Sequence, residues 1–181
     1  MNVTEILRRI QAGDRHAFAP VVTRYQRPLF GFLGRMGLSQ GVAEEIAQET
    51  FLRAWRNLGQ YNAAHGQFST WLYTIAKNLA LNELSRPATM REIATGETLP
   101  EPTCDRPQPP EALSLNQQRK RLHAALLQLP LAERCVVALA YIRDLEHSEI
   151  ARLENCTIAA VKTRLHRARG KLFNLLENED A

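Results

Sequence analysis

The chain has 181 residues, of which 45% are hydrophobic and 23% are charged, and its formal net charge is +4 at pH 7. This apolar content is ordinary for a globular protein and excludes a wholly disordered chain. The charge is uneven, because basic residues exceed acidic ones in 1–86 and 113–181, whereas 87–112 is acidic and rich in proline.

Leader, membrane and cysteine signals are weak. No charged leader followed by an apolar run opens the sequence, and no apolar run approaches the roughly 18 residues of a membrane span. We therefore expect a cytoplasmic protein without membrane insertion. Cys104, Cys135 and Cys156 are widely spaced, and no CxxC, HxxxH or HExxH motif occurs, so we expect no disulfide framework, no metal site and no cofactor. A redox role for any of the three thiols stays open.

Hydrophobic residues recur at helical spacing along most of the chain, which predicts an all-α fold. The predicted helices are 2–17, 18–35, 41–59, 69–86, 112–128, 131–142, 147–153 and 157–177. Six prolines fall between Arg86 and Ala112, and proline at this density stops helices and favours extended backbone. We expect two small helical domains, 1–86 and 112–181, joined by a flexible linker over 87–111. A rigid loop packed on one body is the alternative.

The predicted helix 41–59 has two different faces. Its apolar face consists of Ala43, Ala47, Phe51, Ala54 and Leu58. Its opposite face consists of Glu45, Glu49, Leu52 and Arg56, with Gln48 and Arg53 at the edges. A leucine framed by acidic residues on an outward face is either a solvated exception or the anchor of a docking site for a basic helical partner. The sequence leaves both interpretations open.

The predicted helix 69–86 carries polar groups in register. Its core-facing stripe is Leu72, Ile75, Ala76 and Leu79. A neighbouring stripe holds Trp71, Thr74, Asn78 and Asn82, and we expect Tyr73 and Lys77 on the remaining, solvent-facing side. An aromatic ring stacks on bases and amides bond to their exposed edges, so this pattern is typical of single-strand binding. A half-buried polar flank is the alternative.

The last two predicted helices form a helix-turn-helix pattern. Asn155 suits a left-handed turn residue and Thr157 suits an N-cap. The buried stripe of the last helix is Val161, Leu165, Ala168 and Leu172, and Lys162, Thr163, His166, Arg167 and Arg169 point away from it. No acidic residue lies between Lys162 and Lys171, whereas a merely solvated face usually mixes both signs. The pattern therefore favours a recognition helix for the major groove.

Two segments resemble the bacterial sigma factors of the extracytoplasmic-function (ECF) group of the sigma-70 family. AEEIAQETFLRAWRNLG, followed by FSTWLYTIAKNLALNELSR, is similar to their region 2. LQLPLAERCVVALAYIRDLEHSEIARLENCTIAAVKTRLHRARGKL is similar to their region 4, a pattern that response-regulator output domains share. The two matches stand in the family's order and cover most of 18–86 and 112–176.

This resemblance implies an alternative sigma factor, of the kind used in stress responses, that binds core RNA polymerase and directs promoter-specific transcription initiation. It also implies an anti-sigma factor as a partner. Core polymerase contacts would fall on Glu45, Gln48, Glu49 and Leu52. Contacts with the −10 element of promoter DNA would fall on Trp71, Tyr73, Lys77, Asn78 and Asn82. Contacts with the −35 element would fall on Lys162, Thr163, Arg164, His166, Arg167 and Arg169, with Arg164 and Arg169 on phosphate.

Four positions depart from the family's usual residues. Ala159 and Ala160 replace a Gly-Thr pair, which removes a hydroxyl that could contact phosphate. Thr157 replaces a common proline, and Glu146 replaces Ser or Thr, which leaves the N-cap of the predicted helix 147–153 open.

Two other functions remain to be compared with a sigma factor. A helix-turn-helix regulator acting without core polymerase would need a ligand or phosphoacceptor domain, which 1–86 does not resemble. A metal-dependent enzyme could use His147, Cys156 and His166. We expect no enzyme, because the sequence offers no nucleophile–base pairing and no phosphate-binding glycine loop.

Overall fold

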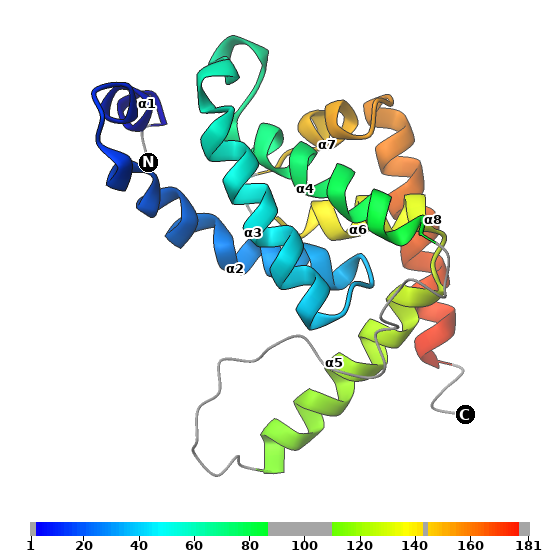
Figure 1. The fold of residues 1–181 in the computed structure, drawn as a ribbon. Helices are drawn as coiled ribbons and strands as arrows, with labels where there is room; N and C mark the ends of the chain where they lie inside the picture. The colour runs from blue at the N-terminus through cyan, green and yellow to red at the C-terminus, as the bar shows by residue number, and fades with distance from the viewer. Residues whose placement is uncertain (1–2, 87–109, 143–144, 178–181) are drawn as a thin grey trace.

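The computed structural model describes residues 3–86, 110–142 and 145–177, and every regular element in these ranges is a helix (Figure 1). The elements of the N-terminal module are α1 (Val3–Gln11), η1 (Arg15–Phe18), α2 (Ala19–Arg35), α3 (Gln40–Arg56), η2 (Leu58–Gln60), η3 (Ala63–His65) and α4 (Phe68–Leu84). Those of the C-terminal module are α5 (Pro110–Gln128), α6 (Leu131–Ala140), α7 (His147–Leu153) and α8 (Ile158–Glu177). The all-α prediction is confirmed. The predicted linker lies outside the described residues, apart from Pro110 and Glu111, which begin α5.

The first predicted helix, 2–17, is wrong in its length. α1 ends at Gln11, and Gly13 follows with a φ of 92°, a conformation that costs glycine little. Asp14 then caps η1 by accepting a hydrogen bond of 3.0 Å from the His16 backbone N–H. Hydrogen bonds from the Arg9 guanidinium also hold the pKa of the Asp14 carboxyl below its usual value. The helical periodicity continues across this break, so the sequence pattern alone did not reveal it.

α2, α3 and α4 pack together as the core of the N-terminal module. Ser39 begins α3 by accepting a 3.5 Å hydrogen bond from the Val42 backbone N–H. The predicted apolar face of α3 is buried at its alanines and at Leu58, which follows the helix, with Phe51 partly buried. Small side chains let helices approach closely, and the large residues Leu29, Phe32 and Leu72 of α2 and α4 are fully buried here.

The core of the C-terminal module lies between α6, α7 and α8. Val136, Leu139, Ile150 and Val161 have no exposed surface, and Leu126 of α5 is also buried. The α8 stripe predicted from the sequence is confirmed as the face that packs inward. α5 runs beside α8 and projects away from the N-terminal helices (Figure 1).

The two modules also contact each other, which the sequence did not predict. α2 packs against α6, and α4 packs against α7. At the end of α2, His123 Nε2 lies 3.1 Å from the Gly34 carbonyl oxygen, and the Arg134 guanidinium donates to the Met36 carbonyl at 3.3 Å. The Gly34 carbonyl also accepts from the Gly37 backbone N–H at 2.9 Å, so His123 and Arg134 add contacts from the C-terminal module at the end of α2.

Candidate functional site

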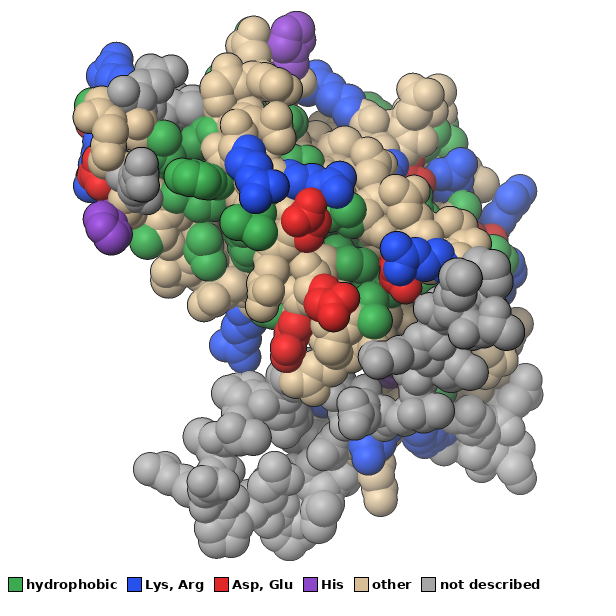
Figure 2. All heavy atoms as spheres, viewed as in Figure 1, with side chains coloured by type: hydrophobic (Ala, Val, Ile, Leu, Met, Phe, Trp, Pro, Cys, Tyr) green, Lys and Arg blue, Asp and Glu red, His purple; other side chains and the backbone are tan. Residues whose placement is uncertain are grey.

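The outward face of α3 combines charge with exposed apolar surface. Glu45, Gln48 and Leu52 are exposed, as predicted, and Leu52 keeps 44% of its surface. Glu49 is partly buried and pairs with Arg53 at 2.6 Å. Figure 2 shows acidic side chains along this face of α3, with basic ones toward its C-terminal end.

Trp55 belongs to the same face, and the sequence analysis missed it. Its side chain is 39% exposed and stands three residues after Leu52, so the two are neighbours on the helix surface. The helical spacing of two large apolar residues could have revealed it. Paired apolar side chains within a polar rim are typical of a protein-docking site.

The four residues of the predicted polar stripe on α4 differ in how exposed their side chains are. Asn78 and Asn82 are exposed, as a strand-reading face requires. Trp71 is only partly exposed, because its ring packs within an aromatic cluster, 5.7 Å from the Tyr61 ring and 5.5 Å from the Phe68 ring. Thr74 turns its hydroxyl back to the Thr70 carbonyl at 2.7 Å. The amides are therefore the freely presented part of this stripe.

The solvent-facing orientation predicted for Tyr73 and Lys77 is wrong. Tyr73 is fully buried and meets Phe32 of α2 edge to face, with ring centroids 5.6 Å apart. Lys77 donates to the Leu153 carbonyl and pairs with Glu154 at 3.4 Å. α4 packs against α2 and α3 and also against α7, so the positions of Tyr73 and Lys77 are covered, whereas Asn78 and Asn82 stay exposed.

The exposed face of α8 agrees with the prediction. The side chains predicted to point outward, Lys162, Thr163, His166, Arg167 and Arg169, are all exposed. Arg164 is partly buried, because it pairs with Glu154 at 3.4 Å. The side chain nominated for a phosphate contact thus already holds an acidic partner within the protein.

The turn before α8 is built as the sequence predicted. Asn155 adopts a φ of 47°, and the Cys156 backbone N–H closes the turn on the Ala151 carbonyl at 2.9 Å. Thr157 caps α8 by accepting from the Ala160 backbone N–H at 3.1 Å. Glu146 stands at the N-cap of α7 in a capping box with Glu149, so the departure from Ser or Thr at this position leaves the helix capped.

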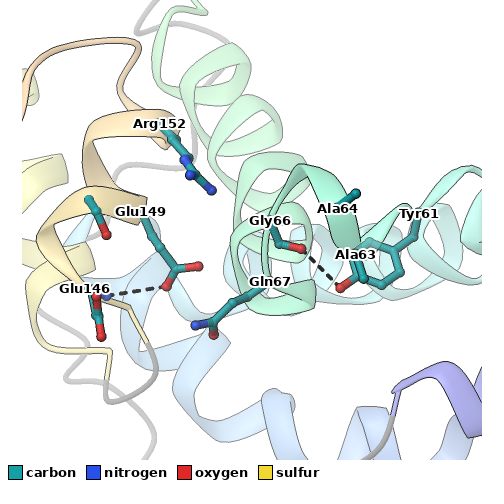
Figure 3. A pocket seen from close by; sticks show the side chains of 9 residues that line it. Tyr61, Ala63, Ala64, Gly66, Gln67, Glu146, Glu149 and Arg152 are labelled. Carbon is teal, nitrogen blue, oxygen red and sulfur yellow. Dashed lines mark hydrogen bonds between the residues drawn. The ribbon is translucent and has the colours of Figure 1, made fainter.

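A cleft lies between the loop that precedes α4 and the start of α7 (Figure 3). Its lining residues are Tyr61, Ala63, Ala64, Gly66, Gln67, Glu146, Ser148, Glu149 and Arg152. Tyr61 closes the loop by donating to the Gly66 carbonyl at 3.2 Å. Among the described residues no group of three or more His, Cys, Asp or Glu side chains could hold a metal ion, so His147, Cys156 and His166 form no such site.

The cysteine thiols of the described residues are shielded from solvent to different degrees. Burial raises the pKa of the Cys135 thiol, and the Glu154 carboxylate, 3.2 Å from its sulfur, raises it further. Cys156 is partly buried, and Cys104 lies outside the described residues.

No helix within the described ranges has the length and apolar character needed to cross a membrane.

The structure is thus an all-α protein with a basic exposed face on α8 and an exposed face on α3 that combines acidic and apolar side chains, and comparison with known proteins gives its family. The family described as Sigma-70 region 2 matches residues 21–89, and Sigma-70, region 4 matches residues 119–172. The ECF RNA polymerase sigma factor SigW of Bacillus subtilis (strain 168) is 32% identical over 98% of this chain and 98% of its own length. The RNA polymerase sigma-H factor of Pseudomonas aeruginosa is 30% identical over 96% of this chain and 93% of its own length. The chain belongs to the ECF group of the sigma-70 family of RNA polymerase sigma factors.

Two solved structures share the fold of this chain. The structure of CnrH in complex with the cytosolic domain of CnrY has a TM-score of 0.70 at 23% identity and covers 96% of both chains. RpoE in complex with the anti-sigma factor NepR from Bartonella quintana has a TM-score of 0.68 at 21% identity, over 90% of this chain and 98% of that one. A regulator acting without core polymerase is not favoured, because region 2 matches the half of the chain that such a protein would not need.

Proposed function

We propose that this sigma factor gives core RNA polymerase its promoter specificity by three separate surfaces. The α3 face, with Glu45, Gln48, Glu49 and Leu52, binds the polymerase, and Trp55 extends its apolar part. α4 reads the melted downstream element, and α8 reads the duplex upstream element. The chain carries out no covalent chemistry and works in the cytoplasm, where its polymerase is.

The observation that carries this proposal is the presence of three chemically different outward faces on one small fold. A major groove displays a distinct edge pattern for each base pair, so a helix bearing Lys162 and Arg167 suits a duplex. Unpaired bases expose edges that amides can bond, so Asn78 and Asn82 suit a single strand.

The remaining residues of these helices take supporting roles. On α8, Thr163 and His166 lie toward the bases, whereas Arg164 and Arg169 contact phosphate. On α4, Trp71 and Lys77 hold the strand. Tyr73 supports α4 from behind through its contact with Phe32.

We also propose a division of roles along the chain that uses the domain boundaries expected from the sequence. We propose that residues 1–86 act as region 2 and residues 112–181 as region 4, with the segment between them joining the two. CnrH and RpoE were each solved with a bound regulator, CnrY and the anti-sigma factor NepR respectively. We infer that an anti-sigma factor likewise binds this chain.

Run-off transcription tests the proposal. Core polymerase from the source organism is supplied with sheared genomic DNA, with and without this protein as the sole specificity factor, and RNA 5′ ends are sequenced. New start sites preceded by a shared pair of sequence elements are expected only when the protein is present. Start sites that are the same with and without the protein would refute the proposed function.

A further inference from the structure

The first turns of α8 carry an exposed surface that is largely apolar. Ile158, the first residue of the helix, keeps 45% of its surface, and Ala159 beside it is also exposed. Within 157–163 the only charged residue is Lys162, and the other cations of this helix follow from Arg164 onward. The exposed face of α8 therefore changes from mainly apolar to mainly cationic along its length.

Thr163 adds a methyl group to this surface, because its hydroxyl is already engaged within the helix. The hydroxyl donates to the Ala159 carbonyl, one turn earlier, at 2.9 Å. Thr163 is exposed, so a ligand meets its methyl group and the lone pairs of its oxygen, but no free hydroxyl hydrogen. Ala159 and Thr163 are four residues apart and share one face, with Ile158 in the adjoining row. These three side chains offer carbon–hydrogen surface and no hydrogen-bond donor.

The position of this surface in the fold suggests what it contacts. A single exposed isoleucine needs no explanation, but the N-terminal residues of a recognition helix are the ones that contact base edges in a helix-turn-helix protein. Thymine alone presents a methyl group in the major groove, where the other bases show donors and acceptors. Ala159 and Ala160 stand where the family usually has Gly-Thr, so the apolar start of the helix is particular to this chain.

We propose that Ile158 and Thr163 are specificity-determining residues, which select a thymine in the upstream element by enclosing its C5 methyl group. The inference deepens the proposed function and rests on it, because it takes α8 as the helix that enters the major groove. Enclosing one methyl-sized group contributes about 0.8 kcal/mol, which is about fourfold in affinity. Phosphate contacts, such as that proposed for Arg169, position the helix without reading sequence.

Replacing thymidine with deoxyuridine tests this contact, since it deletes the methyl group and keeps every hydrogen-bonding group of the base. Holoenzyme, assembled from core polymerase and this protein, is bound to a promoter identified by run-off transcription. Each thymine of the upstream element, on either strand, is replaced in turn, and anisotropy at fixed salt measures Kd. At one position we expect the wild type to bind the thymine promoter about fourfold more tightly than the uracil promoter. Uracil outside the promoter elements should leave Kd unchanged.

Three variants then identify the side chains that make the contact. Ile158→Ala and Thr163→Ser each remove apolar surface and should bring the thymine-to-uracil affinity ratio toward one. Thr163→Val keeps the methyl group while removing the hydroxyl, so it should keep the ratio. Leu122→Ala is the matched control, because Leu122 is 44% exposed and lies on α5, and it should also keep the ratio. Circular dichroism checks that each variant is folded.

Several results would overturn the methyl contact. Equal affinities for the thymine and uracil promoters at every position would do so, as would a ratio that persists in both Ile158→Ala and Thr163→Ser. A ratio lost in Thr163→Val and kept in Thr163→Ser would make the hydroxyl the reading group instead. The proposed function fails in a different way. A chain that supports no promoter-specific transcription would refute the sigma activity and this inference with it, whereas specific transcription with equal affinities would refute the inference alone.

Discussion

Leu52 is a large apolar side chain that the fold leaves 44% exposed, whereas Ala43, Ala47 and Ala54 on the same helix turn inward. An exposed leucine by itself needs no explanation. Here Trp55 is exposed beside it and Glu45 lies on the same face, so the surface combines an apolar centre with a polar rim. That combination is what distinguishes a docking anchor from an isolated exception.

Leu52→Asp should therefore weaken binding to core polymerase while the protein stays folded. Truncating a desolvated anchor costs about 2 kcal/mol or more, which is roughly thirtyfold in Kd. Leu122→Asp is the matched control, since Leu122 is also 44% exposed and lies on α5. Affinity is measured by anisotropy and folding by circular dichroism. Equal losses for both variants would contradict the docking role of α3.

Cys135 illustrates how burial determines reactivity. Its thiol is enclosed and its pKa is raised, first by burial and then by Glu154, so the reactive thiolate is scarce at neutral pH. In a Cys104→Ser, Cys156→Ser background, we expect iodoacetamide to leave Cys135 unmodified at pH 7 until denaturant is added. Mass spectrometry of the native and unfolded protein measures the labelling. Rapid labelling of the native protein would show that the thiol is accessible.

At the scale of single helices, α8 and α4 differ in how far their sequences predicted their surroundings. α8 buries Val161, Leu165 and Ala168 and leaves the opposite face exposed, so its periodicity identified both faces. α4 contacts other helices on several sides, and residues outside its apolar stripe, such as Tyr73, are buried as well. Periodicity reports one buried face, and a helix enclosed on several sides gives no such signal.

The two helices should respond differently to mutation. Lys162→Ala and Arg167→Ala should weaken binding of holoenzyme to the duplex upstream element, by about 1–3 kcal/mol for a base contact, whereas a phosphate contact lowers the salt slope by about one. Asn78→Ala and Asn82→Ala should spare duplex binding but relax base preference in the downstream element, because amides bond exposed base edges.

Filter binding on matched duplex and pre-melted promoters separates these effects. The α8 variants should lose affinity on both templates, because both keep the upstream duplex. The asparagine variants should differ from the wild type only where the downstream bases are unpaired. Equal losses on the two templates for the asparagine variants would contradict a strand-reading α4.

At the scale of the whole molecule, the packing of the two modules against each other could not be predicted from the sequence. Each helix except the first was predicted to within a few residues, because each has a buried stripe and recognisable ends. The inter-module contacts depend on single polar pairs such as Thr70 with Glu149, and no local pattern marks them. Resemblance to a family supplied the roles of the outward residues, but it gave no indication that Lys77 and Arg164 share a carboxylate.

Gly37 lies where side chains of the C-terminal module pack closely on the N-terminal module. Gly37 and Gly13 both have a φ of 92°, so alanine at either costs about 1–2 kcal/mol in backbone strain. A Cβ at Gly37 would also lie 2.7 Å from Leu127 and 2.7 Å from Arg134 of the other module, whereas nothing lies within 4 Å at Gly13. Both contacting atoms are the ends of flexible side chains that can shift, so Gly37→Ala should lose more unfolding free energy than Gly13→Ala by about 1 kcal/mol or less. Urea denaturation measures both, and equal losses would contradict the close packing of the Leu127 and Arg134 side chains on Gly37.

Promoter opening tests the central claim, that this chain directs core polymerase to open specific DNA. Permanganate oxidises unpaired thymines, so it maps melted bases on a promoter identified by run-off transcription. Core polymerase with this protein should give reactive thymines in the downstream element, and core polymerase alone should give none. An identical pattern of reactivity with and without the protein would contradict the assignment of promoter recognition and melting to this chain.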